Sequence, residues 1–189
     1  MSLNTIAINK LMNQFDGHES LWLFGYGSLI FKADFSFIEC KPAGIRNWTR
    51  RFWQASHDHR GTIEKPGRVA TLIPQPGALC EGLAYRITPQ VFDQLDYREK
   101  NGYLRVATKI SFEDGGNAEG LVYIAPQDNA AFLGPENERD IAKQIAAAAG
   151  PSGRNRDYLI ELARALRELG KDDPHVFAIE QHLMEIDGA

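Results

Sequence analysis

Hydrophobic residues follow two different spacings along the chain. Short apolar and β-branched runs between glycine- and proline-rich turns dominate the first two thirds and predict β-strands. Apolar residues three and four positions apart dominate the last third and predict helices with one buried face. Strands followed by helices, without regular alternation, favour the α+β class. The expected strands cover residues 21–24, 69–73, 82–87, 104–112 and 119–125.

Five helices are expected from the same periodicity. The second follows Thr88 and Pro89, a good N-cap residue and the residue favoured at the first helical position. The third ends at a glycine-proline stop signal. Residues 46–68 show little periodicity and are expected to be mostly loop with short strands. The first helix carries Ile8, Leu11, Met12 and Phe15 on one face, and the others are expected near residues 88–96, 137–149, 157–169 and 173–186.

Size and composition limit the classes of function. A chain of 189 residues fits one domain, and 43% hydrophobic with 24% charged residues is typical of soluble globular proteins. A formal net charge of -4 argues against binding of nucleic acid or an anionic membrane by the chain as a whole. No apolar stretch approaches the ~20 residues of a membrane span, and the first residues lack the features of a signal peptide. Only Cys40 and Cys80 are present, so no disulfide framework is expected and the cytoplasm is the predicted location.

A glycine-rich turn directly follows the first predicted strand. Gly25 and Gly27 surround Tyr26, and glycines permit a positive φ, so that successive backbone N–H groups can converge on an amino-acid carboxylate. Ile30 stands where a dinucleotide fingerprint has its third glycine, and no Gly-Lys-Ser/Thr follows, so neither a Rossmann nor a phosphate-binding loop is indicated. Ser28 also lacks the flanking residues of a nucleophile elbow. Taken alone, the turn is also consistent with a tight strand-to-loop connection.

Two other motifs and one carboxylate leave alternatives open. His57 and His59 have the spacing of zinc ligands on a strand, but no third ligand stands at a characteristic spacing, so hydrogen bonding in a loop is the preferred interpretation. The cluster at residues 50–53 mixes arginine with aromatic residues, as nucleic-acid surfaces do. In a net acidic chain we expect arginine to pack on aromatic faces there, and Arg51 is also able to pair with a substrate carboxylate. Glu99, between two basic residues, is by itself an ordinary turn glutamate.

Six short blocks together resemble a known family. The sequence GYGSLI at residues 25–30 is similar to the YGSL signature of the γ-glutamylcyclotransferases, and five further blocks are similar to their glutathione-specific, ChaC-like branch. The blocks occur in the family's order and cover the chain from residue 21 to residue 169. The further blocks are residues 50–54 (RRFWQ), 58–61 (DHRG), 65–69 (KPGRV), 95–100 (LDYREK) and 150–155 (GPSGRN).

The resemblance implies both a fold and a reaction. The implied fold is a single domain over residues 21–189, a compact mixed barrel-like sheet with flanking helices, preceded by an N-terminal helical extension over residues 1–20. The implied enzyme converts glutathione to 5-oxoproline and cysteinylglycine with no cofactor and no metal, and Glu99 is its catalytic acid and base. We add Tyr103 and Tyr123 as residues expected to orient the substrate. The turn implied to hold the γ-glutamyl group comprises Phe24, Gly25, Tyr26, Gly27, Ser28 and Leu29.

Two alternatives to this function stay open at the level of sequence. The enzyme could act on other γ-glutamyl amino acids or γ-glutamylamines, because the sequence does not identify the side chains that line the leaving-group pocket. The chain could instead be a non-catalytic binding or regulatory protein, although the glutamate retained within Arg98-Glu99-Lys100 argues against that. The expected partner in each enzymatic case is a small molecule, and neither nucleic acid nor membrane is expected. The oligomeric state is not indicated.

Overall fold

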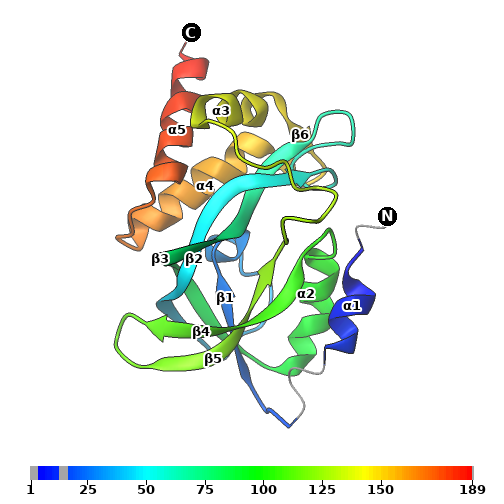
Figure 1. Ribbon diagram of the computed structural model, residues 1–189, viewed down its shortest axis with the longest axis vertical. Helices are drawn as coiled ribbons and strands as arrows, with labels where there is room; N and C mark the ends of the chain where they lie inside the picture. Colours follow the sequence, from blue (N-terminus) through cyan, green and yellow to red (C-terminus); the bar gives the residue numbers. More distant parts are fainter. Residues whose placement is uncertain (1–3, 13–16, 189) are drawn as a thin grey trace. The chain divides into compact units, whose positions relative to one another are not determined.

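Five strands close into a barrel in the order β1-β3-β2-β4-β5 (Figure 1). The structure is a computed structural model that describes residues 4–12 and 17–188. β1 runs antiparallel to β3 and parallel to β5, so that Leu23 lies opposite both Tyr85 and Leu121. The mixed barrel-like sheet with flanking helices and the α+β class are therefore confirmed. The strands are β1 (Leu21–Gly25), β2 (Glu39–Ser56), β3 (Gly67–Ile87), β4 (Leu104–Phe112) and β5 (Asn117–Ile124).

All five expected helices are present. The second begins as a 3₁₀ turn, Pro89–Val91, directly after Thr88. Two of the others have side-chain caps, because Asn137 accepts a hydrogen bond from the Asp140 N–H and Asp173 accepts one from the Val176 N–H. None of the helices in the described ranges is long and apolar enough to cross a membrane. The helices are α1 (Ile6–Leu11), α2 (Phe92–Arg98), α3 (Glu138–Ala147), α4 (Asn155–Glu168) and α5 (Pro174–Asp187), and the short pair β6 (Ala149–Gly150) and β7 (Gly153–Arg154) precedes α4.

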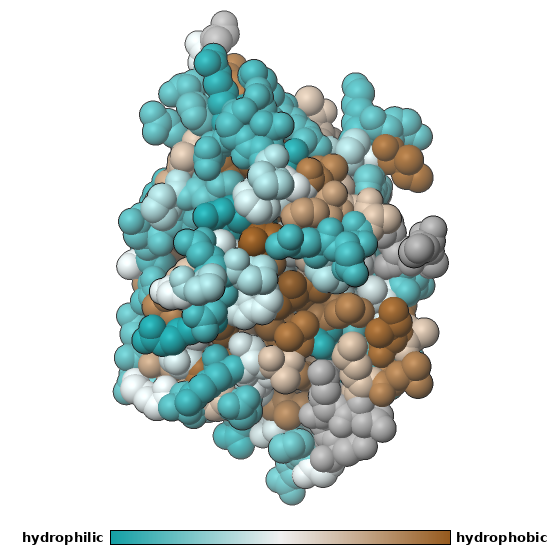
Figure 2. Space-filling model, in the orientation of Figure 1, coloured by the Kyte–Doolittle hydropathy of each residue, from teal (hydrophilic) through white to brown (hydrophobic). Residues whose placement is uncertain are grey.

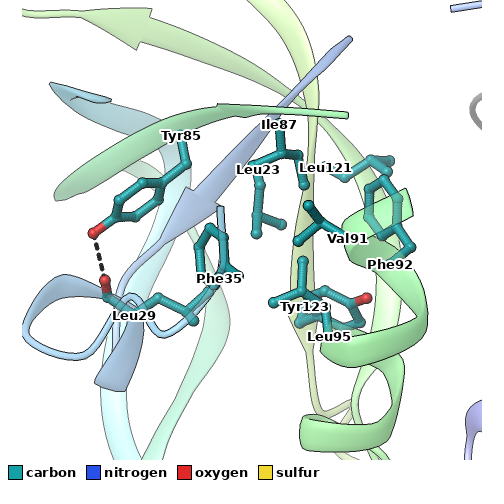
Figure 3. Packing of buried hydrophobic residues seen from close by; sticks show 10 residues of the cluster. All are labelled: Leu23, Leu29, Phe35, Tyr85, Ile87, Val91, Phe92, Leu95, Leu121 and Tyr123. Carbon is teal, nitrogen blue, oxygen red and sulfur yellow. Dashed lines mark hydrogen bonds between the residues drawn. The ribbon is translucent and has the colours of Figure 1, made fainter. Parts of the chain in front are cut away.

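Contacts within the domain group into two units. The first unit comprises Met1–Thr49 and Leu72–Ala130, and the second comprises Arg50–Thr71 and Ala131–Ala189. In the first unit Phe92 and Leu95 of α2, with Val91 of the preceding 3₁₀ turn, pack on one side of the sheet (Figure 3). The core cluster shown there consists of Leu23, Leu29, Phe35, Tyr85, Ile87, Val91, Phe92, Leu95, Leu121 and Tyr123.

The strands β2 and β3 are longer than expected. Residues 46–68 were predicted to be mostly loop, but β2 continues without interruption to Ser56. Its buried positions include Arg50 and Gln54. Because these inward-facing residues are polar, the alternation of buried and exposed positions along β2 does not appear as an alternation of apolar and polar residues in the sequence. The Pro-Gln-Pro-Gly sequence at residues 74–77 was predicted to separate two strands, but it lies inside β3. Prolines are tolerated there because the ladder is locally irregular, with Gly77 at φ 82° and its N–H bound to the side chain of Asn47.

The N-terminal helix exists, but its apolar residues are not its buried face. α1 has only six residues, and the one that is buried is Asn9. Ile8 and Leu11 are exposed, and Figure 2 shows hydrophobic residues gathered on the surface at the position of α1. Phe15, which was assigned to the same face, lies outside the described residues. The amphipathic interpretation was wrong because Ile8 and Leu11 face solvent, while hydrogen bonds of Thr5 and Asn9 join this segment to the rest of the chain.

The second unit contains a buried histidine that makes folding pH-dependent. His175 Nε2 accepts a hydrogen bond from the Phe52 N–H at 3.1 Å, and Nδ1 lies 3.1 Å from Glu138 Oε1, so the folded state holds a neutral ring with its proton on Nδ1. Burial lowers the pKa of His175 below its ordinary value of 6.5, although Glu138 opposes that shift. The unfolded chain then binds more protons than the folded chain below pH 6.5.

We therefore expect the free energy of unfolding to fall as the pH falls below 6.5. Urea unfolding at neutral and mildly acidic pH measures this change in wild type, in His175→Gln and in the control His182→Gln, whose histidine is partly exposed. The change should be smaller in His175→Gln and the same as wild type in His182→Gln. Equal pH dependence in all three proteins would contradict the assignment.

Candidate active site

The glycine-rich turn leads from β1 into a single turn of 3₁₀ helix, Ser28–Ile30. The first backbone hydrogen bond of this helix runs from the Ile30 N–H to the Gly27 carbonyl, at 3.0 Å. The N–H groups of Ser28 and Leu29 precede that bond and therefore have no acceptor within the helical turn itself. The turn can present these donors to an anionic or carbonyl oxygen.

The expected positive φ angles do not occur in this turn. Gly27 has φ −120° and ψ −127°, and neither Gly25 nor Gly27 is among the described residues with positive φ. Gly25 is needed for close packing instead, since a Cβ at this position would lie 2.7 Å from the Cβ of Leu29. The donors of the turn belong to the start of a 3₁₀ helix and not to a left-handed nest, so this part of the prediction was wrong.

Buried tyrosines hold the turn in place from the core. The Tyr85 hydroxyl donates to the Leu29 carbonyl at 2.6 Å (Figure 3), and the Tyr26 hydroxyl donates to the Tyr123 carbonyl at 2.8 Å. The side chains of Phe24 and Leu29 are 1% and 6% exposed. These two residues therefore offer a ligand their backbone and not their side chains.

One guanidinium joins the turn to Glu99. Arg98 Nη2 donates to Ser28 Oγ at 2.8 Å, while Nη1 donates to the Lys32 carbonyl at 3.0 Å and to the carboxylate of Asp34. The Nε atom of the same side chain lies 3.4 Å from Glu99 Oε1. Arg98 thus fixes the turn and the carboxylate relative to each other, and its charge faces both Asp34 and Glu99.

Glu99 combines a buried carboxyl with a position at the end of a helix. It is the C-cap residue of α2, and its N–H donates to the Leu95 carbonyl at 2.8 Å. Its side chain is only 16% exposed. Burial raises the pKa of Glu99 above the ordinary value of 4.5, Arg98 opposes this rise, and Asp34 adds to it. A carboxyl with a raised pKa is better matched to accepting and returning a proton near neutral pH.

The two tyrosines expected to orient the substrate differ in their surroundings. Tyr123 is 3% exposed, and its hydroxyl donates to Asp96 Oδ1 at 2.6 Å. Burial, and then the hydrogen bond to Asp96, raise the pKa of Tyr123, so its hydroxyl keeps its proton. Arg105 Nε lies 3.3 Å from the same Asp96 oxygen. Tyr103 is partly buried and packs against the core cluster of the first unit.

The remaining sequence motifs lie in the second unit. His57 and His59 follow the end of β2, and His59 Nδ1 lies 3.1 Å from Ser152 Oγ, so the predicted loop hydrogen bonding is confirmed for His59. Within residues 4–12 and 17–188, no group of three or more His, Cys, Asp or Glu residues is arranged to hold a metal ion. The Arg51 guanidinium lies 5.9 Å from the centre of the Trp53 ring, which confirms packing of arginine on an aromatic face.

Comparison with known proteins places these residues in a family. The family model described as ChaC-like protein matches residues 21–186. The chain belongs to the ChaC-like family. This ChaC-like chain is 42% identical over 179 residues to glutathione-specific gamma-glutamylcyclotransferase 1 of Danio rerio, an alignment that covers 89% of this chain and 91% of the relative. It is also 42% identical over 179 residues to gamma-glutamylcyclotransferase 2-3 of Arabidopsis thaliana, with 88% and 90% covered.

A solved structure supports the same relationship. The fold is similar to the crystal structure of the gamma-glutamyl cyclotransferase specific to glutathione from yeast, with a TM-score of 0.83 and 31% sequence identity. The match covers 89% of this chain and 97% of the yeast chain. The family resemblance drawn from the six sequence blocks is therefore confirmed along with the fold.

The structure brings together the turn and Glu99, but through residues that the sequence did not single out. Arg98 was noticed only as a neighbour of Glu99 within the LDYREK block. Asp34 was missed, because no motif surrounds it and 64 residues separate it from Arg98 along the chain. Asp96 lies within a recognised block, yet its burial beside Arg105 follows from packing that no local pattern reveals.

Proposed function

We propose that this ChaC-like chain is a glutathione-specific γ-glutamylcyclotransferase, which converts glutathione to 5-oxoproline and cysteinylglycine. The observation that carries the proposal is the buried carboxyl of Glu99, tied through Arg98 to a turn that can donate backbone hydrogen bonds. Relatives that carry the name glutathione-specific gamma-glutamylcyclotransferase support glutathione as the substrate. A cytoplasmic location remains a prediction from the cysteine count.

The reaction needs little more than positioning and one proton carrier. The α-amine and the γ-carbonyl of glutathione belong to the same glutamyl residue, so attack of the amine on that carbonyl closes a five-membered lactam and breaks the bond to cysteinylglycine. Because both reactants are tethered, the protein chiefly has to hold the substrate in attack geometry. Glu99 would take a proton from the ammonium group before attack and return it to the departing amine.

The turn supplies the complementary half of the site. Attack converts the γ-carbonyl oxygen to an oxyanion, and backbone N–H donors that are already oriented stabilise such a charge. We assign this role to the N–H groups of Ser28 and its neighbours at the start of the 3₁₀ helix. Tyr103 and Tyr123 are both assigned to orient the substrate, and Tyr123 does so from the core, through its bonds to Asp96 and to the Tyr26 hydroxyl.

Incubation of the purified protein with glutathione tests the proposal. We expect 5-oxoproline and cysteinylglycine to form in equal amounts without added nucleotide or metal. Parallel reactions with γ-glutamyl amino acids and γ-glutamylamines measure specificity, which matters because the Arabidopsis thaliana relative is named without reference to glutathione. Turnover of those compounds in place of glutathione would overturn the substrate assignment, and no turnover of any of them would favour a non-catalytic role.

Asp34 is expected to shift the pH at which the enzyme loses activity. The general base must be deprotonated, so kcat/KM should rise with pH through the raised pKa of Glu99. In Asp34→Asn a negative charge that raises this pKa is removed, and Arg98 is left with Glu99 as its nearby carboxylate partner. Both changes lower the pKa of Glu99, so the acidic limb of the kcat/KM profile should move to lower pH. A limb that stays in place, or moves to higher pH, would contradict this electrostatic role.

A further inference from the structure

The N-terminal segment, residues 4–12, is hydrogen-bonded to the part of the chain that follows Glu99. The Thr5 N–H and the Thr5 hydroxyl both donate to the Lys100 carbonyl, at 2.8 and 3.0 Å. Asn4 and Asn101 form an isolated antiparallel bridge next to these bonds. Figure 1 shows α1 lying beside α2, the helix that ends one residue before Glu99. The N-terminal segment therefore contacts the chain immediately after the carboxylate.

Asn9 is the central residue of this contact. Its side chain is fully buried, although asparagine is usually exposed, and both of its amide atoms are used. Nδ2 donates to the Tyr103 carbonyl at 3.1 Å, and Oδ1 accepts from the Arg105 N–H at 3.0 Å. The Asn9 carbonyl also accepts a hydrogen bond from the Arg105 guanidinium. One asparagine thus fixes the backbone on either side of Leu104, where β4 begins.

The same contact continues through buried polar groups to the glycine-rich turn. Arg105 pairs with Asp96, and Asp96 accepts the hydroxyl of Tyr123. The Tyr123 carbonyl in turn accepts the hydroxyl of Tyr26 in the turn. Asn9 therefore stands at one end of a series of buried hydrogen bonds and one ion pair that reaches the glycine-rich turn. The Thr5 bonds to the Lys100 carbonyl reach the residue after Glu99. In buried networks of this kind the members stabilise one another, and loss of one member affects the others.

The segment after Glu99 receives hydrogen bonds from outside it. Residues 99–103 join a helix to a strand through a reversal in which Gly102 has φ 92°, a value that glycine adopts at low cost. Within the reversal, the Glu99 N–H bonds to the Leu95 carbonyl and the Gly102 N–H to the Lys100 carbonyl. The bonds to Lys100 and Tyr103 described above come from the N-terminal segment, which lies before the family match that begins at residue 21.

We propose that the N-terminal segment completes the active site of this chain through Thr5 and Asn9, and that Asn9 is a positioning residue for Glu99 and Tyr103. The inference rests on the proposed role of Glu99. Asn9 touches neither substrate nor reacting atoms; it holds the backbone of Tyr103 and Arg105, and through them the carboxyl of Glu99 keeps its buried place. A displacement of about 1 Å at a reacting group is enough to cost on the order of 100-fold in rate.

The test compares Asn9→Ala with wild type and with Ile8→Ala, a truncation of a half-exposed residue in the same helix. Asn9→Ala should lower kcat for glutathione about 10–100-fold, through misplacement of Glu99. Its acidic limb should move to lower pH, because a looser reversal lets water reach the carboxyl. Ile8→Ala should keep both the kcat and the acidic limb of wild type. Asn9→Asp keeps an acceptor for the Arg105 N–H but places an oxygen against the Tyr103 carbonyl, so its kcat should fall at least as far as that of Asn9→Ala.

Each outcome decides the matter. A folded Asn9→Ala protein with wild-type kcat and an unmoved acidic limb would overturn the proposal, and so would a variant that loses only thermal stability. If Asn9→Ala does not fold, the same two measurements on Asn9→Asp decide, with wild-type values again counting against it. Failure of the proposed function can be told apart from failure of this inference, because wild type itself would then not turn over glutathione. The variants are then compared on whichever γ-glutamyl compound wild type does convert.

Discussion

Replacement of Glu99 by glutamine is expected to lower kcat for glutathione by about 10²–10⁴-fold, the usual contribution of a general acid–base group. Glutamine keeps the size of the side chain but can neither accept nor return a proton at its amide. Steady-state kinetics of the purified variant measure the loss. Binding of glutathione, measured by calorimetry, should persist because the turn and Arg98 remain in place.

Stability separates this role from a structural one. Because burial raises the pKa of Glu99, the charged form is disfavoured in the folded state, so the neutral variant should unfold at the same or a higher urea concentration at neutral pH. The matched control is Glu119→Gln, the same chemical change at an exposed position of β5, which should leave turnover unchanged. Near-normal turnover in folded Glu99→Gln would end the assignment of Glu99 as the proton carrier.

The parts of the fold that follow from local patterns were predictable. Short apolar runs located β1, β4 and β5, and helical spacings located the last three helices, because each of these elements buries apolar residues in a core. The barrel closure was not derivable in this way, since the parallel pairing of β1 with β5 joins residues about a hundred positions apart. It came from the family resemblance.

The errors share a physical cause, which is burial of polar groups. Arg50 and Gln54 made β2 look irregular, although each faces inward along a regular strand. Asn9 is buried in a helix in which Ile8 and Leu11 are exposed. A hydrophobicity pattern assumes that apolar residues are inside, and buried polar residues break that assumption wherever they find hydrogen-bond partners.

The same limit applies to the site. The sequence pointed to the turn and to Glu99 because these lie within recognisable blocks. It did not point to Asp34 or Arg105, whose roles depend on which charges face each other after folding. Asp96 is the clearest case. It lies within the LDYREK block, which resembles the family, but its burial (2% exposed) beside the equally buried Arg105 follows only from the folded structure.

Asp96→Asn is therefore expected to destabilise the protein by about 3–5 kcal/mol, the range measured when one partner of a buried ion pair is removed. Asparagine still offers an acceptor to the Tyr123 hydroxyl, but the Arg105 guanidinium keeps its charge in a site from which water is excluded. The uncompensated charge, and not lost volume, causes the effect. Urea unfolding at neutral pH measures it.

Asp93→Asn provides the control, because Asp93 lies on the same helix one turn earlier and is 86% exposed beside Lys10. Removal of that exposed pair should change the free energy of unfolding by less than about 1 kcal/mol. The double change Asp96→Asn with Arg105→Met should recover part of the stability lost in Asp96→Asn, since it also removes the buried charge. If Asp96→Asn unfolds at the urea concentration of Asp93→Asn, the buried pair does not stabilise this part of the fold.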